Sequence, residues 1–91
     1  MLTIGPLNES NPSFGGADVA FAVPRAGAIS VEVFDVTGRL VSTLASGERA
    51  PGRYQARWEG GASGRPAASG IYFVRLRAAE VQMVRRLVLA R

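Results

Sequence analysis

Turn-forming residues recur along this chain at intervals of roughly eight to twelve residues. The run Asp35-Val36-Thr37-Gly38 has Asp first and Gly fourth, which a type I turn prefers. Pro51-Gly52 supplies the central pair of a type II turn, and residues 24–27 (P-R-A-G) suit a type I turn closed by a bulge. No segment keeps the 3.6-residue apolar period of a helix, so the pattern predicts short strands joined by tight turns.

Between these turns apolar and polar side chains alternate, as in strands with one buried face. The apolar positions are Val19, Phe21 and Val23; Ile29, Val31 and Val33; Leu40, Val41 and Leu44; Tyr54, Ala56 and Trp58; and Tyr72, Val74 and Leu76. Trp58 is the single tryptophan and should be the largest side chain in the core. Residues 2–7 give only a weak strand signal because Gly5-Pro6 interrupts them.

Residues 70–91 should form two long strands joined by a turn at residues 78–80, and residues 60–69 a long connection before them. About seven strands result, which predicts an all-β fold, an antiparallel immunoglobulin-like β-sandwich. A small SH3-like barrel is the structural alternative. The 91 residues are 47% hydrophobic, which is enough for one globular domain over residues 1–91 but leaves no room for a second core.

The composition argues against catalysis. The chain has no His and no Cys, so the commonest general base and the thiol nucleophile are both missing. The seven carboxylates stand singly at turns or on polar faces, and the Gly-rich residues 60–70 lack the Gly-Lys-Ser/Thr of a phosphate loop and the clustered oxygens of a calcium site. We expect no catalytic residue, cofactor or metal.

The net charge of +4 is the difference between eleven basic residues, all of them arginine, and seven carboxylates. The arginines are spread singly along the predicted strands, as at positions 53, 57, 75 and 77, which favours solvated outer faces over a nucleic-acid surface. No apolar run reaches the roughly 18–20 residues of a spanning helix. The N-terminal M-L-T-I-G-P-L lacks the charged and apolar regions of a signal peptide, so an export signal would lie outside this sequence.

Aromatic side chains on a β-sandwich can also form a sugar-stacking platform. The candidates are Tyr54, Trp58, Tyr72 and Phe73. Alternation puts Tyr54 and Trp58 on the apolar face and Phe73 on the face opposite Tyr72, beside Arg75. A core position is therefore the favoured interpretation for Trp58.

An ordered set of short motifs gives a family resemblance over residues 11–91. These motifs are N-P at 11–12, V-E-V-F-D-V-T-G-R-L-V at 31–41, P-G-R-Y at 51–54, W-E-G at 58–60, S-G-I-Y-F-V-R-L at 69–76 and a final R-R-L-V-L-A-R. The set resembles the C-terminal sorting domains of the type IX (Por) secretion system. It is also similar to the immunoglobulin-like domain of flagellar hook-capping proteins.

The sorting-domain resemblance implies a seven-stranded sandwich at the C-terminal end of a larger exported bacterial protein. The upstream cargo in such proteins is a hydrolase, such as a glycoside hydrolase or peptidase, or an adhesin. The outer-membrane secretion and attachment machinery recognises the domain, which is then cleaved off or holds the cargo at the cell surface. The expected location is the outer membrane, the cell surface or the medium, and the domain is expected to be a monomer that binds no nucleic acid.

The same resemblance marks residues for recognition by that machinery. Carried over by position, they are Gly70, Ile71, Tyr72, Arg85, Arg86, Leu87, Val88, Leu89 and Arg91. Asn11, Pro12, Gly38 and Trp58 correspond to structural positions. Gly61 and Ala79 depart from the family pattern, which has Asp and Gly there. Two further hypotheses stay open at this point: a structural assembly module of the flagellar hook-cap type, and a carbohydrate-binding module.

Overall fold

The computed structural model describes residues 3–4, 13–14, 16–62, 65–79 and 81–90, and every regular element in them is a strand. Six strands are long: β3 (Ala17–Val23), β4 (Gly27–Asp35), β5 (Leu40–Arg49), β6 (Gly52–Trp58), β9 (Gly70–Ala78) and β10 (Val81–Ala90). Four are short: β1 (Thr3–Ile4), β2 (Ser13–Phe14), β7 (Gly61–Ala62) and β8 (Arg65–Pro66).

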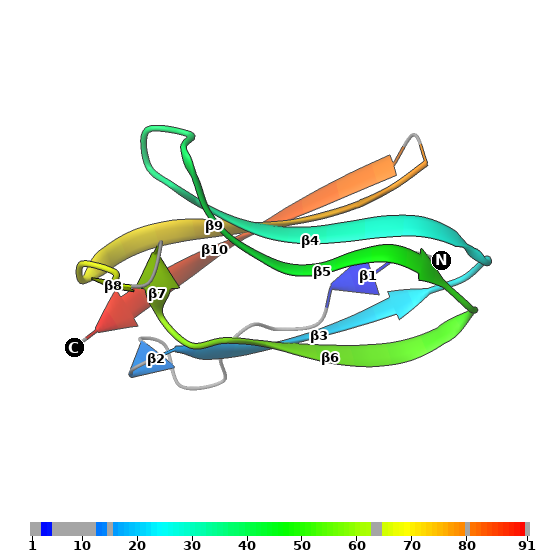
Figure 1. Ribbon diagram of the computed structural model, residues 1–91, viewed down its shortest axis with the longest axis horizontal. Coiled ribbons are helices and arrows are strands. Elements are labelled where there is room, and N and C mark those ends of the chain that lie inside the picture. Colours follow the sequence, from blue (N-terminus) through cyan, green and yellow to red (C-terminus); the bar gives the residue numbers. More distant parts are fainter. Residues whose placement is uncertain (1–2, 5–12, 15, 63–64, 80, 91) are drawn as a thin grey trace.

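The strands form a two-layered sandwich (Figure 1). One sheet has the order β1-β3-β6, the other has the order β2-β10-β9-β4-β5, and β7 and β8 make a small separate hairpin. The pairings are antiparallel except for β2, which runs parallel to the end of β10. The two short strands at the start of the chain, β1 and β2, each pair with a different sheet. Counted together as one divided strand, they make the predicted seven with the six long strands. The antiparallel immunoglobulin-like sandwich is confirmed.

The core fills the space between the two sheets and follows the predicted alternation. Its buried apolar residues are Ala17, Val19, Phe21, Val23, Ile29, Val31, Val33, Trp58, Ala67, Tyr72, Val74, Leu76, Leu87 and Leu89. Trp58 is 1% exposed, which confirms its predicted place in the core, and its Nε1 donates a hydrogen bond to the carbonyl of Gly61 at 3.0 Å. Burying the indole therefore leaves its polar N–H satisfied.

The turn between β4 and β5 is held by the side chain of Asp35. The amide of Gly38 donates to the Asp35 carbonyl at 3.0 Å, as the predicted type I turn requires. One carboxylate oxygen of Asp35 also accepts from the Thr37 hydroxyl at 2.6 Å, the Thr37 amide at 2.9 Å and the Arg39 amide at 3.1 Å. These bonds, led by the one from the Thr37 hydroxyl, lower the pKa of Asp35 below its ordinary value of 3.8.

Two segments differ from the sequence-based expectation. Strand β5 continues to Arg49, beyond the predicted end at Leu44, and Leu40 is 49% exposed. The register between β4 and β5 shifts at Val31/Glu32 and again at Val33/Phe34, so strict alternation does not hold along β5. The predicted connection at residues 60–69 instead contains the β7–β8 hairpin, closed by a bond from the Ala67 amide to the Gly60 carbonyl. The structural positions Asn11 and Pro12 lie outside the described residues.

Candidate functional site

Eight of the nine predicted recognition residues lie on the hairpin formed by β9 and β10, which pairs nine residues from each strand. Tyr72, Leu87 and Leu89 point into the sandwich and are 6%, 1% and 1% exposed. The Tyr72 hydroxyl donates to the Ala68 carbonyl at 2.6 Å, and its ring meets Trp58 edge-on. A partner of the folded domain cannot reach these three side chains, so their contribution is to the shape and stability of the hairpin.

The opposite face of the hairpin presents the accessible members of the set. Ile71 lies across from Val88, Phe73 across from Arg86, and Arg75 across from Val84. Ile71 and Val84 are 42% and 45% exposed, Arg86 is exposed, and Phe73 and Val88 are half-buried. We call Ile71, Phe73, Val84, Arg86 and Val88 the outer hairpin face. It brings Ile71 of β9 next to Val88 and Arg86 of β10, which lie 15 or more residues further along the chain.

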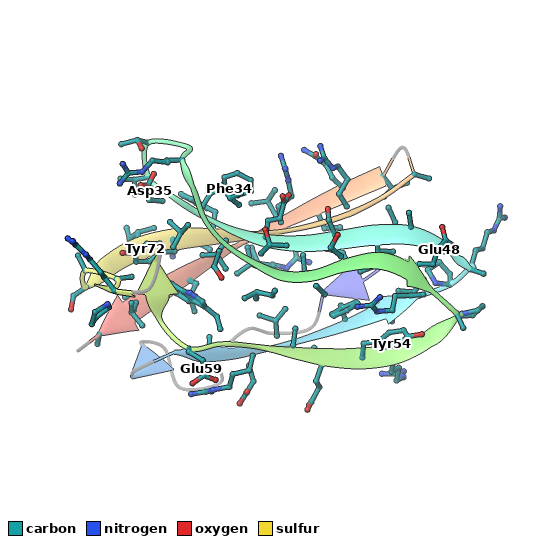
Figure 2. All side chains as sticks on the ribbon, in the orientation of Figure 1. Phe34, Asp35, Glu48, Tyr54, Glu59 and Tyr72 are labelled. Carbon is teal, nitrogen blue, oxygen red and sulfur yellow. The ribbon has the colours of Figure 1, made fainter. Side chains whose placement is uncertain are left out.

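The apolar surface continues from the outer hairpin face onto β4. Phe34 pairs with Phe73, and Leu40 of β5 pairs with Phe34. Figure 2 shows Phe34 on the side of the five-stranded sheet that faces away from β3 and β6. Phe34 and Val84 were not predicted as site residues. Phe34 shares its side of β4 with Glu32, opposite the predicted core positions Val31 and Val33.

An ion pair lies on the same side of the sheet, where Glu32 of β4 pairs with Arg75 of β9. An Nη of Arg75 is 2.6 Å from Oε1 of Glu32, and the guanidinium stacks over the Phe34 ring with Cζ at 4.5 Å from the centroid. Their side chains are only 24% and 16% exposed, and Nε of Arg75 is buried without a hydrogen-bond partner. Arg75 is therefore held in place by Glu32 and Phe34 of the neighbouring strand. Arg85 and Arg86, by contrast, form no salt bridge with any carboxylate in the described residues.

Gly70 is half-buried at the start of β9 with a φ of 151°, in a region that favours glycine. Arg85 is exposed on β10 and donates to the Val84 carbonyl at 3.2 Å. Arg91 lies outside the described residues. Three of the nine positions are therefore buried, five are half-buried or exposed, and Arg91 lies outside the described residues.

Three other carboxylates in the described residues form ion pairs with arginines. Arg57 lies between Asp18, at 3.2 Å, and Glu59, at 3.3 Å, while Arg39 approaches Asp35 at 3.5 Å. Within the described ranges no three acidic side chains gather in a group that could hold a metal ion.

The aromatic rings considered for sugar binding do not share one exposed face. Trp58 and Tyr72 are buried against each other, and Tyr54 stacks on Phe21 with ring centroids 5.5 Å apart. Phe73 alone of the four lies on the outer hairpin face. The described residues therefore form no flat platform of exposed rings.

Comparison with known protein families identifies the family of this domain. The family model described as the FlgD Ig-like domain matches residues 8–81. The chain belongs to the FlgD Ig-like domain family. The matched range contains the strands from β2 to β9 and ends at the first residue of β10.

This FlgD Ig-like domain also resembles a solved structure, that of dimeric latent PorU from Porphyromonas gingivalis. The TM-score is 0.72 and the sequence identity 20%, with 98% of this chain and 9% of the PorU chain covered. The likeness is one of fold, and the chain spans less than a tenth of the PorU chain. No curated protein matches this sequence. No helix in the described part of the chain is long and apolar enough to cross a membrane.

Proposed function

We propose that this domain is a non-catalytic sorting and surface-attachment module at the C-terminal end of a larger exported bacterial protein. The observation that carries the proposal is the outer hairpin face, an apolar surface that includes Ile71, Arg86 and Val88, three of the positions that the sorting-domain resemblance marks for recognition. Within the described residues Arg86 forms no salt bridge. Apolar patches rimmed by polar groups are typical of protein interaction sites. The outer-membrane secretion and attachment machinery is the proposed partner.

The extent of the two comparisons supports sorting over flagellar assembly. The FlgD family model stops at residue 81, so nearly all of β10 lies beyond it. The likeness to PorU extends over 98% of the chain. The name PorU also contains Por, the name of the secretion system whose sorting domains the sequence resembles.

Burial divides the labour within the predicted recognition set. Tyr72, Leu87 and Leu89 hold β9 and β10 against the core, while Ile71, Arg86 and Val88 meet the partner from outside. Deleting residues 87–91 would remove two fully buried leucines, so lost export of such a truncation would report unfolding as readily as lost recognition. Surface substitutions are the sharper test.

The experiment fuses the domain to a folded reporter and expresses it in a type IX-competent host. Ile71→Glu and Arg86→Glu should each lower reporter export by about tenfold or more, because a tenfold loss needs only about 1.4 kcal/mol of binding free energy. Arg53→Glu, at an exposed position of the other sheet, is the matched control and should leave export unchanged. All variants must keep the unfolding temperature of the parent domain. Unchanged export of both hairpin variants would refute the proposal.

A structural assembly module of hook-cap type is the second candidate, and the family match favours it. In that case the domain would fail to carry a reporter out of the cell. It would instead associate stably with flagellar hook-cap protein in solution, which sedimentation of the mixed proteins would detect.

A further inference from the structure

The edge of β10 that faces away from β9 has no strand partner among the described residues along most of its length; we call it the open edge. Only Leu89 and Ala90 at its far end pair with β2. Among the residues that the structure describes, none pairs with Val81–Val88 on that side. β1 comes near β10 but is hydrogen-bonded within the other sheet. Alternate residues of an antiparallel edge strand direct their N–H and C=O groups away from the neighbouring strand. This edge therefore offers a row of backbone donors and acceptors.

An apolar groove lies on the core side of the same edge. It has a volume of about 710 Å³ and lies between the β3–β4 turn and the β9–β10 hairpin. Its lining includes Val23, Pro24 and Ile29 from one side and Ala78, Val81 and Met83 from the other. Val81 and Met83 lie across from Ala78 and Leu76, so they point toward the core side of β10. Core-side side chains of a strand added beside β10 would enter this groove.

The arginines of β10 determine which kind of strand can pair with its open edge. Arg85 lies across from the buried Val74, on the core side of β10, and is exposed. An inward-pointing charge on an edge strand opposes pairing with a neutral strand, because pairing would desolvate it. A second copy of the domain would add its own arginines. An incoming carboxylate, by contrast, would compensate Arg85, and another would meet Arg86 on the outer side.

We propose that the open edge of β10 binds an extended polypeptide by strand addition, with apolar side chains beside Val81–Val84 and carboxylates beside Arg85 and Arg86. In strand addition, main-chain hydrogen bonds supply affinity and pockets for alternate side chains supply specificity. The added strand runs antiparallel to β10, the pairing that is slightly more stable per residue. This inference goes beyond the proposed function and does not depend on it, since a domain can bind a strand whether or not it directs export.

The probe is a fluorescent peptide, Thr-Thr-Glu-Glu-Val-Val-Thr-Val, whose order places both carboxylates opposite Arg85 and Arg86 in the antiparallel register. Fluorescence anisotropy should show saturable binding. The peptide with lysine in place of both glutamates should bind at least about tenfold more weakly, a difference of about 1.4 kcal/mol. Hydrogen exchange of the intact domain should show amide protection that appears on peptide addition at residues 81–88.

Two variants and a control test the residues involved. Arg85→Glu should lose the glutamate peptide and gain the lysine peptide, a charge exchange that a misfolded domain could not produce. Val81→Asp, at a 53% exposed position that lines the groove, should weaken binding by about tenfold. Val36→Asp, at a 68% exposed position in the β4–β5 turn, should bind as the parent does.

Three results would overturn the proposal. One is no saturable binding at peptide concentrations up to about 1 mM, which corresponds to a binding free energy of about −4.1 kcal/mol. Another is binding that Arg85→Glu leaves unchanged or that protects amides elsewhere. The third is protection of residues 81–88 that rises with protein concentration without peptide, which would make a second copy the occupant. Export of the reporter is measured separately, so peptide binding without export, or export without binding, tells the two proposals apart.

Discussion

The ring of Tyr72 meets the indole of Trp58 edge-on, with centroids 5.0 Å apart and an interplanar angle of 62°. Trp58 ends β6 in one sheet and Tyr72 lies near the start of β9 in the other, so this contact joins the two layers. Each ring also hydrogen-bonds to a carbonyl of the segment between them, at Gly61 and Ala68. The pair thus joins the two sheets and anchors the main chain at Gly61 and Ala68.

Breaking this pair should destabilise the domain more than the loss of ring area alone predicts. Trp58→Phe removes volume and a hydrogen bond and should cost about 2–4 kcal/mol of unfolding free energy. In a double-mutant cycle with Tyr72→Leu, measured by urea denaturation, the coupling should be about 0.5–1.5 kcal/mol. A cycle with Phe34→Leu on the outer surface should show additivity. Additivity of the Trp58 and Tyr72 changes would contradict the prediction.

Removing one partner of the Glu32–Arg75 pair should lower the free energy of unfolding much more than replacing both partners with apolar residues. Glu32→Gln leaves a largely buried guanidinium without its counter-charge and should cost about 1.5–3 kcal/mol of unfolding free energy. Replacing both partners, with Glu32→Val and Arg75→Met, should recover most of that loss because neither charge remains to be desolvated. The measurement is urea denaturation of both variants. A double variant less stable than Glu32→Gln would show that the pair itself is strongly stabilising.

Two glycines with positive φ should differ in tolerance to alanine. A Cβ on Gly16, at φ +150°, would lie 2.3 Å from the Trp58 backbone oxygen, whereas a Cβ on Gly38, at φ +86°, would meet open space. Gly38→Ala should therefore cost only backbone strain, about 1–2 kcal/mol. Gly16→Ala adds a clash with the main chain and should cost clearly more in the same denaturation assay. Equal losses would mean that the chain around Gly16 relaxes freely.

Acid should weaken the β4–β5 turn through Asp35. The pKa of Asp35 in the folded protein is lowered below 3.8, the value for the unfolded chain. The carboxylate therefore stabilises the fold above the unfolded-state pKa, and this stabilisation is lost as the pH falls through the folded-state pKa. Thr37→Ala removes the leading cause and should raise the pKa of Asp35, measured by NMR titration of its carboxyl carbon. Thr43→Ala, at an exposed position on β5, is the control. A titration midpoint unchanged by Thr37→Ala would contradict this assignment.

Alternation predicted the core faces of β3, β4, β6 and β9 because both faces of these strands have distinct surroundings. On β10 only Leu87 and Leu89, which were predicted as recognition residues, are buried. The other sheet has three described strands against five, and β1 is only two residues long, so its described strands leave part of the core side of β10 uncovered. Val81 and Arg85 consequently stay exposed on a side that would otherwise be core.

The outer hairpin face could be predicted only in part. The resemblance pointed to Ile71, Arg86 and Val88, yet the contact of Phe34 with Phe73 depends on register between strands far apart in the chain. Alternation within one strand says which face a side chain occupies but not its neighbour across the sheet. The β7–β8 hairpin was not predicted for another reason. Each of its strands has only two residues, which is too short for a periodic pattern.

The parallel pairing of β2 with β10 has a mechanical consequence. Ser13 and Phe14 lie alongside Leu89 and Ala90 in the same direction. Tension between the chain before Ser13 and the chain after Ala90 would pull these two strands along their axes in opposite senses. Their hydrogen bonds would then carry the load together in shear instead of opening one after another. This short parallel pair would therefore resist such a pull better than an antiparallel pair whose bonds open one at a time.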